Sequence, residues 1–320
     1  MPRSLGKKIL PAILLASLAA VILIGCGNEY KIDSPAKSGM IGDDASDDTT
    51  GDDTQSDDDT VPSDTFEIVF IDVGLGDSTL ITIPDLPSAH HVLIDGGKVG
   101  DGQYTVCPLL ASKGISSLDV MVVTHPDYDH CGGLSEVFSC VTVAEVWENG
   151  DTEPTDDGWL AYVAARNAWG GPVSTPALNS TNQVGDAVFT VVNTLGDFTE
   201  PNDNSMVLKM DLGGHGYLFC ADAQQPSQDW MASNQADKLP SDAIKVPDHG
   251  SYPFSQDFIN AVSPHIAACS VGPNDLGLPD QRTLDAYSAV TSGHLYDTQN
   301  NGDITVTLDP QDNLVVTTAH

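Results

Sequence analysis

The chain has 320 residues, of which 46 are Asp or Glu and 12 are Lys or Arg, so its formal net charge at pH 7 is −34. Its apolar content of 40% allows a sizeable core, which excludes a wholly disordered protein. The acidic excess argues against a protein that coats nucleic acid, because phosphate binding needs clustered Lys and Arg, but it does not exclude a small site made electropositive by metal.

The first 25 residues have the features of a secretory signal. Three basic residues precede an apolar run over 9–24, which at 16 residues is shorter than the ~20 that a membrane-spanning helix needs. The run ends in Leu-Ile-Gly-Cys, which resembles a bacterial lipobox and implies that Cys26 is lipidated. We therefore expect a signal peptide over 1–25 and a lipid-anchored protein in the cell envelope, periplasmic or on the outer surface. A plain secretory signal is the alternative.

Residues 26–64 are predicted to be a disordered tether. The part from 43 to 64 holds ten Asp and no Lys or Arg, so like charges repel and few apolar side chains oppose them. Asp-rich runs can bind calcium, but this one lacks the spaced glycine and closing glutamate of a calcium loop. The predicted working domain is then 65–320, which holds 34 acidic and seven basic residues and keeps a charge of −27.

Strand and helix patterns alternate along this domain. We expect strands at 66–73, 78–83, 91–95, 118–124, 141–147, 187–194, 205–211, 216–221, 242–247, 266–271, 303–308 and 314–318. We expect helices at 104–113, 133–139, 156–169, 226–234, 255–262 and 279–290. Interleaving of this kind favours an α/β layered domain.

The strongest functional signal follows the apolar strand at 118–124. His125, Asp127, Asp129 and His130 come within six residues, on a loop before a helix. Imidazole and carboxylate groups are metal ligands, and α/β sheets bind ligands at strand ends. The loop therefore predicts a metal site, with an acidic surface loop as the alternative.

Two later strands end in the same residue types. Asp222 follows the strand at 216–221, and Asp248 and His249 follow the strand at 242–247. Alone, such an Asp is usually a helix cap and such a His is usually structural. Three donor clusters at strand ends in one domain instead indicate a shared site.

The order of these motifs resembles the metallo-β-lactamase superfamily, specifically the soluble hydrolase domain of ComEC-type DNA-uptake competence proteins. The matching segments are FIDVGLGDSTLI at 70–81, LIDGG at 93–97, VVTHPDYDHCGGL at 122–134, NDNSMVLKM at 202–210, LFCAD at 218–222, IKVPDHGSY at 244–252, NDLGLP at 274–279 and NGDITV at 301–306. The resemblance covers nearly all of 66–308. It implies a four-layer αββα sandwich with metals at one edge, between two sheets.

The resemblance implies six metal ligands: His125, Asp127, Asp129, His130, Asp222 and His249. Asp127 stands where most of the superfamily has His, and Asp248 replaces the first His of the usual His-His-Gly-Ser; it is a possible seventh ligand. No His is found near 202–204 or at Leu278-Pro279. We therefore expect two divalent ions, one of them held weakly by His125, Asp127 and Asp222. The carboxylate-rich set shifts the preference from zinc toward manganese.

Hydrolysis by a metal-activated water is the implied reaction. Asp129 and Asp222 are expected to orient the water, and His249 to complete a metal shell or to stabilise the leaving oxygen. Substrate contacts are expected from Asn204, Ser205, Lys245 and Ser251. Three further acids beside glycine turns can either fix those turns or face the substrate; they are Asp72, Asp77 and Asp95.

The family-implied substrate is a phosphodiester, either a small one or a nucleic acid such as DNA. The alternatives are hydrolysis of small esters, lactones or phosphate esters, and a non-catalytic metal-binding surface module on the same fold. The acidic domain offers no strong electrostatic surface for nucleic acid. Because salt screens repulsion, we expect any cleavage of DNA to improve with added salt.

Five cysteines remain apart from Cys26, and export permits disulfides among them. Their odd number leaves at least one thiol unpaired. Cys131 directly follows His130, so it is either a soft metal ligand or the partner of Cys107 or Cys140 in a disulfide.

Overall fold

The computed structural model describes residues 30, 31, 65–85, 87–151, 156–196 and 198–320. The predicted signal peptide and Cys26 lie outside these residues, as does the predicted tether except for two positions. Tyr30–Lys31 form strand β1, which pairs with β16 (Leu314–Thr318), so here the structure differs from the expected disorder. In the described part of the chain, no helix has the length and apolar character needed to cross a membrane.

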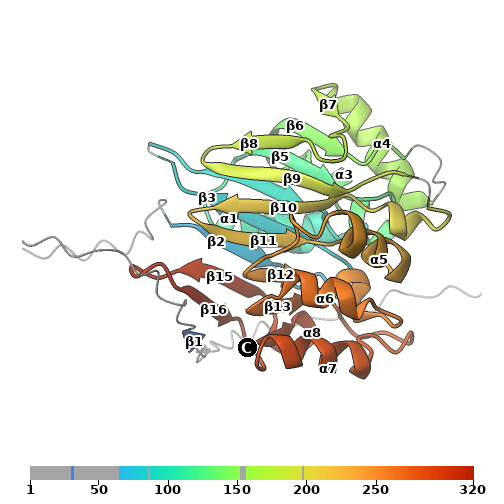
Figure 1. Ribbon diagram of the computed structural model, residues 1–320. Helices are drawn as coiled ribbons and strands as arrows, with labels where there is room; N and C mark the ends of the chain where they lie inside the picture. Colours follow the sequence, from blue (N-terminus) through green and yellow to red (C-terminus); the bar gives the residue numbers. More distant parts are fainter. Residues whose placement is uncertain (1–29, 32–64, 86, 152–155, 197) are drawn as a thin grey trace, which may run out of the picture.

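The first sheet has nine strands and uses both ends of the domain. Its order is β1-β16-β15-β2-β3-β4-β5-β6-β7. The further strands are β2 (Glu67–Phe70), β3 (Thr79–Ile83), β4 (His90–Ile94), β5 (Ser117–Val123), β6 (Thr142–Glu148), β7 (Val173–Ser174) and β15 (Ile304–Leu308). Strands β4 to β7 run parallel, and the hairpin β15–β16 pairs antiparallel with β2. The last strands thereby complete the sheet that the first strands begin (Figure 1).

The second sheet has seven strands, in the order β14-β13-β12-β11-β10-β9-β8. They are β8 (Thr181–Val184), β9 (Ala187–Asn193), β10 (Val207–Leu212), β11 (His215–Phe219), β12 (Ala243–Lys245), β13 (Ile266–Cys269) and β14 (Leu295–Asp297). Strands β11 to β14 are parallel. Each sheet therefore has one parallel half, whose strands end at a common edge.

Helices cover the outer face of each sheet. The first sheet carries η1 (Gly102–Val106), α1 (Cys107–Ser112), α3 (Leu134–Val137) and α4 (Asp157–Trp169). The second carries α5 (Gln225–Asn234), α6 (Gln256–Val262) and α7 (Gln281–Val290), which lie together along one side of the molecule (Figure 1). The layers are thus helix, sheet, sheet and helix, which confirms the predicted αββα sandwich.

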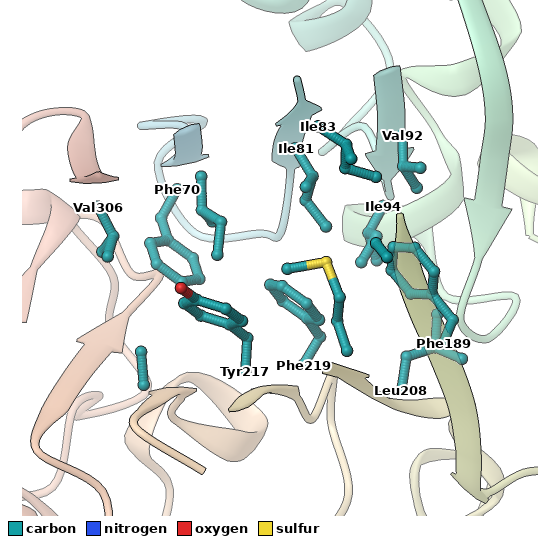
Figure 2. Close-up of a cluster of buried hydrophobic side chains, with 14 of the residues drawn as sticks. Phe70, Ile81, Ile83, Val92, Ile94, Phe189, Leu208, Tyr217, Phe219 and Val306 are labelled. Carbon is teal, nitrogen blue, oxygen red and sulfur yellow. The ribbon is translucent and has the colours of Figure 1, made fainter. Parts of the chain in front are cut away.

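Alternation of side chains along the strands builds two kinds of core. In β2, Ile68 and Phe70 face the second sheet, whereas Val69 packs under the helices. Across the sheet interface the ring centroids of Phe70 and Phe219 are 6.4 Å apart. Figure 2 shows Tyr217 and Phe219 of β11 pointing toward Ile81 and other side chains of the first sheet. Strands buried on both faces explain the continuous apolar runs in the sequence.

All eighteen predicted strands and helices have counterparts, with differences at their ends. The strand expected at 242–247 stops at Lys245, because Pro247 has no amide hydrogen and begins the 3₁₀ turn η3 (Pro247–Gly250). The short strands β7, β8 and β14 were not predicted, nor were the 3₁₀ turn η2 (Pro201–Asn204) and helix α8 (Thr298–Asn301). Helix α2 (Tyr128–Cys131) was not predicted either, and it includes Asp129 and His130, which were expected on a loop. These pieces span four residues or fewer and carry no periodic signal.

One disulfide joins Cys107 to Cys140, with the Cα atoms 6.1 Å apart. The expectation that Cys131 takes part in a disulfide is wrong, because its thiol is free and buried among apolar side chains. Its Sγ lies 3.5 Å from the carbonyl oxygen of Pro126, and burial raises the pKa of this thiol. Among the described residues, it also belongs to no group of side chains that could share a metal ion.

Candidate metal centre

Four strand ends meet at one edge of the two sheets. In the first sheet, Asp95 follows β4 and the segment His125–His130 follows β5. In the second, Asp222 follows β11 and His249 lies in η3, just after β12. Because β4 and β5 are parallel neighbours, as are β11 and β12, their carboxyl ends lie side by side.

Three imidazoles point their Nε2 atoms at one carboxylate. Oδ2 of Asp222 lies 4.0 Å from Nε2 of His125, 3.2 Å from that of His130 and 3.4 Å from that of His249. All three nitrogens are buried, and within the described part of the chain none makes a hydrogen bond. Buried polar atoms rarely lack a partner, and a divalent metal ion would satisfy these together. The donor set therefore fits the metal that the sequence predicts.

The other two predicted ligands lie at the sides of this cluster. Oδ2 of Asp127 is 3.6 Å from Nε2 of His125, and Oδ2 of Asp129 is 3.6 Å from Nε2 of His249. Three groups of possible ligands result, and all include His130: two hold the predicted ligands, one with His125 and Asp222 and the other with Asp129 and His249, and the third adds Asp77 and Asp95. The structure thus brings together all six residues that the sequence singled out as ligands.

Hydrogen bonds to Nδ1, the ring nitrogen that faces away from the cluster, fix the orientation of two of the imidazoles. Nδ1 of His130 is 2.9 Å from Oδ2 of Asp95, whose carboxylate also accepts hydrogen bonds from Thr124 N and Oγ1 at 3.0 and 2.6 Å. Nδ1 of His249 donates to the carbonyl oxygen of Ser270 at 2.8 Å. With Nδ1 engaged in this way, Nε2 is free to bind a metal, which is the usual arrangement behind metal-ligating histidines.

These contacts settle what the sequence left open for three acids. Asp95 holds His130, and Asp72 fixes its turn by accepting a hydrogen bond from Gly74 N at 3.0 Å. Asp77 faces the site, with Oδ1 3.6 Å from Nδ1 of His249. Sequence reasoning missed Thr124, although it directly precedes His125, and the Ser270 carbonyl, which carries no sequence signal.

Lys245 forms a buried ion pair with Asp77 next to the metal ligands. Its Nζ is 2.5 Å from Oδ2 of Asp77 and donates to the carbonyl oxygen of Ala221 at 3.0 Å. Burial lowers the pKa of this ammonium, but the carboxylates of Asp77 and Asp222 outweigh it and hold the pKa above its usual value. Lys245 was predicted to contact substrate; instead, its charged group is bound inside the protein and positions the site.

The buried charges of the centre stabilise one another. Burial favours neutral Asp222, but the imidazoles of His130 and His249 hold its pKa well below the usual value. Burial also favours the neutral form of His130 and by itself would lower the pKa of this imidazole. The charges of Asp222 and Asp77 outweigh burial and hold the pKa of His130 well above the usual value. Asp222 is therefore ionised at neutral pH. Metal and proton compete for the same imidazole nitrogens.

The remaining predicted contacts are used within the protein. Asn204 accepts a hydrogen bond from Gly196 N and donates to the carbonyl oxygen of Phe198, both at 3.0 Å, so it fixes its own loop instead of facing substrate. Ser205 is fully buried. Ser251 lies at the site, where its Oγ donates to Oδ2 of Asp248 at 2.5 Å.

Asp248, the possible seventh ligand, is turned toward its neighbours. Its Oδ2 accepts hydrogen bonds from Ser251 and from Nε2 of Gln224, the latter at 3.1 Å. Among the described residues it belongs to none of the groups of possible ligands. Burial, and then the charge of Asp222, raise the pKa of Asp248 to about 6.

Left-handed backbone conformations gather at this edge. The φ angles are 57° at Asp95, 45° at Ala221, 47° at Asp248 and 49° at His249. Gly76, with φ of 154°, approaches so closely that an added Cβ would lie 2.6 Å from the carbonyl oxygen of Asp129. Only glycine fits there, which accounts for Gly76 in the FIDVGLGDSTLI segment.

Comparisons with known proteins concern the family of the chain. A family model described as the metallo-beta-lactamase superfamily matches residues 71–267. The chain is 28% identical over 228 residues to ComE operon protein 3 of Bacillus subtilis (strain 168), covering 65% of this chain and 29% of that protein. It is 26% identical over 221 residues to competence protein ComA of Neisseria gonorrhoeae, covering 67% and 28%. The chain thus spans less than a third of either relative.

Among solved structures, CmlA, a diiron β-hydroxylase from Streptomyces venezuelae, has a similar fold. It is 14% identical, with a TM-score of 0.54, over 77% of this chain and 54% of CmlA. At this identity the likeness concerns the fold alone. The family match over 71–267, the layered fold and the histidine–aspartate centre agree, and the chain belongs to the metallo-β-lactamase superfamily.

Proposed function

We propose that this chain is a metal-dependent phosphodiesterase that acts on nucleic acid outside the cytoplasm. The observation that carries the proposal is the convergence of three unpartnered histidine nitrogens on the carboxylate of Asp222. Divalent metal bound there would supply a water that ionises near neutral pH and an electrophile for the attacked group.

The residues of the chain have separate tasks in this reaction. Asp129 and the ionised Asp222 accept hydrogen bonds from the attacking water at their carboxylate oxygens and thereby orient it. His249 is held by the Ser270 carbonyl through Nδ1, so its Nε2 stays directed at the site, as a ligand or beside the leaving oxygen. Lys245 forms an ion pair with Asp77 and does not contact substrate.

The composition of the ligand set indicates which metal ion the site prefers. Three carboxylates accompany three imidazoles, and no cysteine lies among the possible ligands of the described residues. Hard oxygen ligands favour manganese-like ions over zinc. His130 is common to the groups of possible ligands, whereas Asp127 belongs to none of them and lies beside His125 alone. We therefore propose two divalent ions, one of them bound weakly.

The choice of nucleic acid rests on the relatives. One of them is named a competence protein and the other a ComE operon protein, and the sequence motifs resemble the hydrolase domain of DNA-uptake proteins. A location outside the cytoplasm has two supports: the lipobox-like sequence at Cys26 and the disulfide between Cys107 and Cys140. Lipid at Cys26 would hold the enzyme at a membrane surface.

The test uses the full chain, purified in mild detergent and reconstituted with manganese or zinc. It is offered bis-p-nitrophenyl phosphate, single-stranded DNA, a lactone and a β-lactam. We expect metal-dependent cleavage of the phosphodiesters, faster with manganese, and a loss of at least about 100-fold in His130→Ala. His265→Ala, which changes a half-exposed histidine outside the ligand groups, should keep full activity.

Each other outcome would reject part of the proposal. Metal bound without turnover of any substrate would favour the non-catalytic binding module. Turnover of the lactone alone would favour the small-ester hydrolase. Tight stoichiometric zinc with no gain from manganese would overturn the metal assignment, and full activity in His130→Ala would overturn the site.

A further inference from the structure

A stacked pair of exposed side chains borders the metal centre. The loop after His249 is tied to the start of α7, since Asp280 N donates to the carbonyl oxygen of Gly250 at 2.9 Å. Thr283 Oγ1 donates to the carbonyl oxygen of Ser251 at 2.7 Å. These bonds bring Arg282 of α7 beside Tyr252, which follows His249 by three residues.

The guanidinium of Arg282 lies on the face of the Tyr252 ring, with Cζ 3.5 Å from the ring centroid. Its edge is held by Asp280, whose Oδ1 accepts from Nε at 2.9 Å and whose Oδ2 accepts from Nη2 at 2.7 Å. Tyr252 is 50% exposed and the side chain of Arg282 61% exposed. The pair is thus a fixed planar surface, open to solvent, at the margin of the site.

We propose that the Tyr252–Arg282 stack binds an unpaired nucleobase of a single-stranded substrate beside the metal centre. The proposal rests on the phosphodiesterase function above and specifies its substrate. Aromatic rings and guanidinium planes are the surfaces on which proteins stack the bases of single strands. In a duplex the bases are already stacked on one another, so a surface of this kind favours single strands.

Two other ligand classes fit the stack poorly. A phosphate is best bound by the two-pronged edge of an arginine, but Asp280 already occupies Nε and Nη2 of Arg282. A quaternary ammonium needs a free aromatic face, and here a cation already covers the face of Tyr252. The flat face of the guanidinium is what remains, and a base is its natural partner.

The negative charge of the domain also favours binding of a base over binding of phosphates. Residues 65–320 carry a formal charge of −27, so a long row of contacts to phosphates is electrostatically unfavourable. Stacking depends little on phosphate charge and needs few residues. A substrate held by its bases on one side of the scissile bond and by the metals at the bond itself is compatible with an acidic enzyme.

The test compares a fluorescein-labelled oligothymidylate with a strand of the same length in which the bases are replaced by abasic sites. Affinity for the full chain is measured by fluorescence anisotropy in EDTA, where cleavage stops, and kcat/KM is measured with metal restored. We expect wild type to bind the strand with bases at least about fivefold more tightly than the abasic strand. Tyr252→Ala should abolish this preference, and Arg282→Gln should reduce it, whereas Tyr252→Phe should retain it.

Tyr104→Ala is the matched control, because Tyr104 is 76% exposed and belongs to η1, not to the stack. Equal binding of both strands by wild type, or a preference that survives Tyr252→Ala, would overturn the proposal. The two hypotheses fail separately. A base preference without cleavage would reject the phosphodiesterase and keep the stack, and cleavage without a base preference would do the reverse.

Discussion

Nζ of Lys245 and Oδ2 of Asp77 lie 2.5 Å apart in the protein interior, one on β12 and the other on the turn before β3. The pair joins the two sheets directly beneath the histidine ligands. Each group is less than 10% exposed, so neither charge can be satisfied by water if its partner is removed.

Lys245→Met should therefore lower the free energy of unfolding by about 3–5 kcal/mol, because it leaves the Asp77 carboxylate buried without its nearest counter-ion. Urea unfolding of the metal-free protein measures this. Lys238→Met removes a surface pair with Asp237 and should cost less than about 1 kcal/mol. Equal stabilities for the two variants would show that the buried pair does not support the fold.

Asp95→Asn should weaken metal binding about 10- to 100-fold, because Asp95 holds His130 through Nδ1 without being a ligand of its own. Competition with a chromogenic chelator measures the affinity. Asp229→Asn changes an exposed acid on α5 and should leave it unaltered. An unchanged affinity in Asp95→Asn would mean that the backbone alone orients His130.

Removal of the disulfide should destabilise the protein by about 2–4 kcal/mol, since Cys107 and Cys140 close a loop with a sequence separation of 33. Thermal unfolding of Cys107→Ala should match that of the reduced wild type. The variant itself should not respond to reductant. A wild type that melts at the same temperature with and without reductant would contradict this.

His90 should contribute a pH-dependent term to stability. Its hydrogen bond to Asp119 raises the pKa of the imidazole; burial opposes this, and Asp85 adds to the increase. The folded state therefore binds the proton more tightly than the unfolded state. The stabilisation is complete below the unfolded pKa of about 6.5 and is lost as pH rises through the folded value.

The variant that tests this is His90→Gln. Its free energy of unfolding should lie below that of wild type at pH 5.5, by less than about 1 kcal/mol because the pair is partly exposed, and the gap should narrow by pH 8.5. Chemical unfolding at both pH values measures the gap. A gap that widens with pH would reverse the sign of the argument.

Salt should increase cleavage of single-stranded DNA. The domain carries −27, and at 0.1 M salt the Debye length falls to about 10 Å, so repulsion of the phosphates is screened. Initial rates at limiting substrate should rise between 20 and 500 mM NaCl. A steep fall would indicate that several phosphates are held by lysine or arginine, against the proposed stacking mode.

Local signals in the sequence predicted the strands, the helices and the convergence of three donor clusters, whereas the resemblance implied the four-layer sandwich. Apolar runs define the long strands, and donors directly after those runs occupy adjacent strand ends once the strands pair. Pairings between distant segments could not be predicted. Lys245 and Asp77 are 168 positions apart, and nothing in either motif shows that the lysine side chain points inward.

The same limit explains the other differences. The partner of Cys107 depended on where α1 meets the end of α3, which spacing does not reveal. Asn204 was assigned to substrate from its motif, but its amide completes hydrogen bonds within its own loop. The Tyr252–Arg282 stack arises from residues 30 positions apart that meet only because α7 is tied to η3.

The left-handed backbone at Asp248 and His249 has a consequence for evolution under selection for stability. A non-glycine residue in this conformation costs on the order of 1–3 kcal/mol, and the two lie in succession. Asp248→Gly would relieve part of that strain and should raise the melting temperature of the metal-free protein. It would also let His249 move relative to Asp222. A screen for heat resistance alone would then select variants that are more thermostable but less active. The strained backbone that holds His249 in place lowers the stability of this chain.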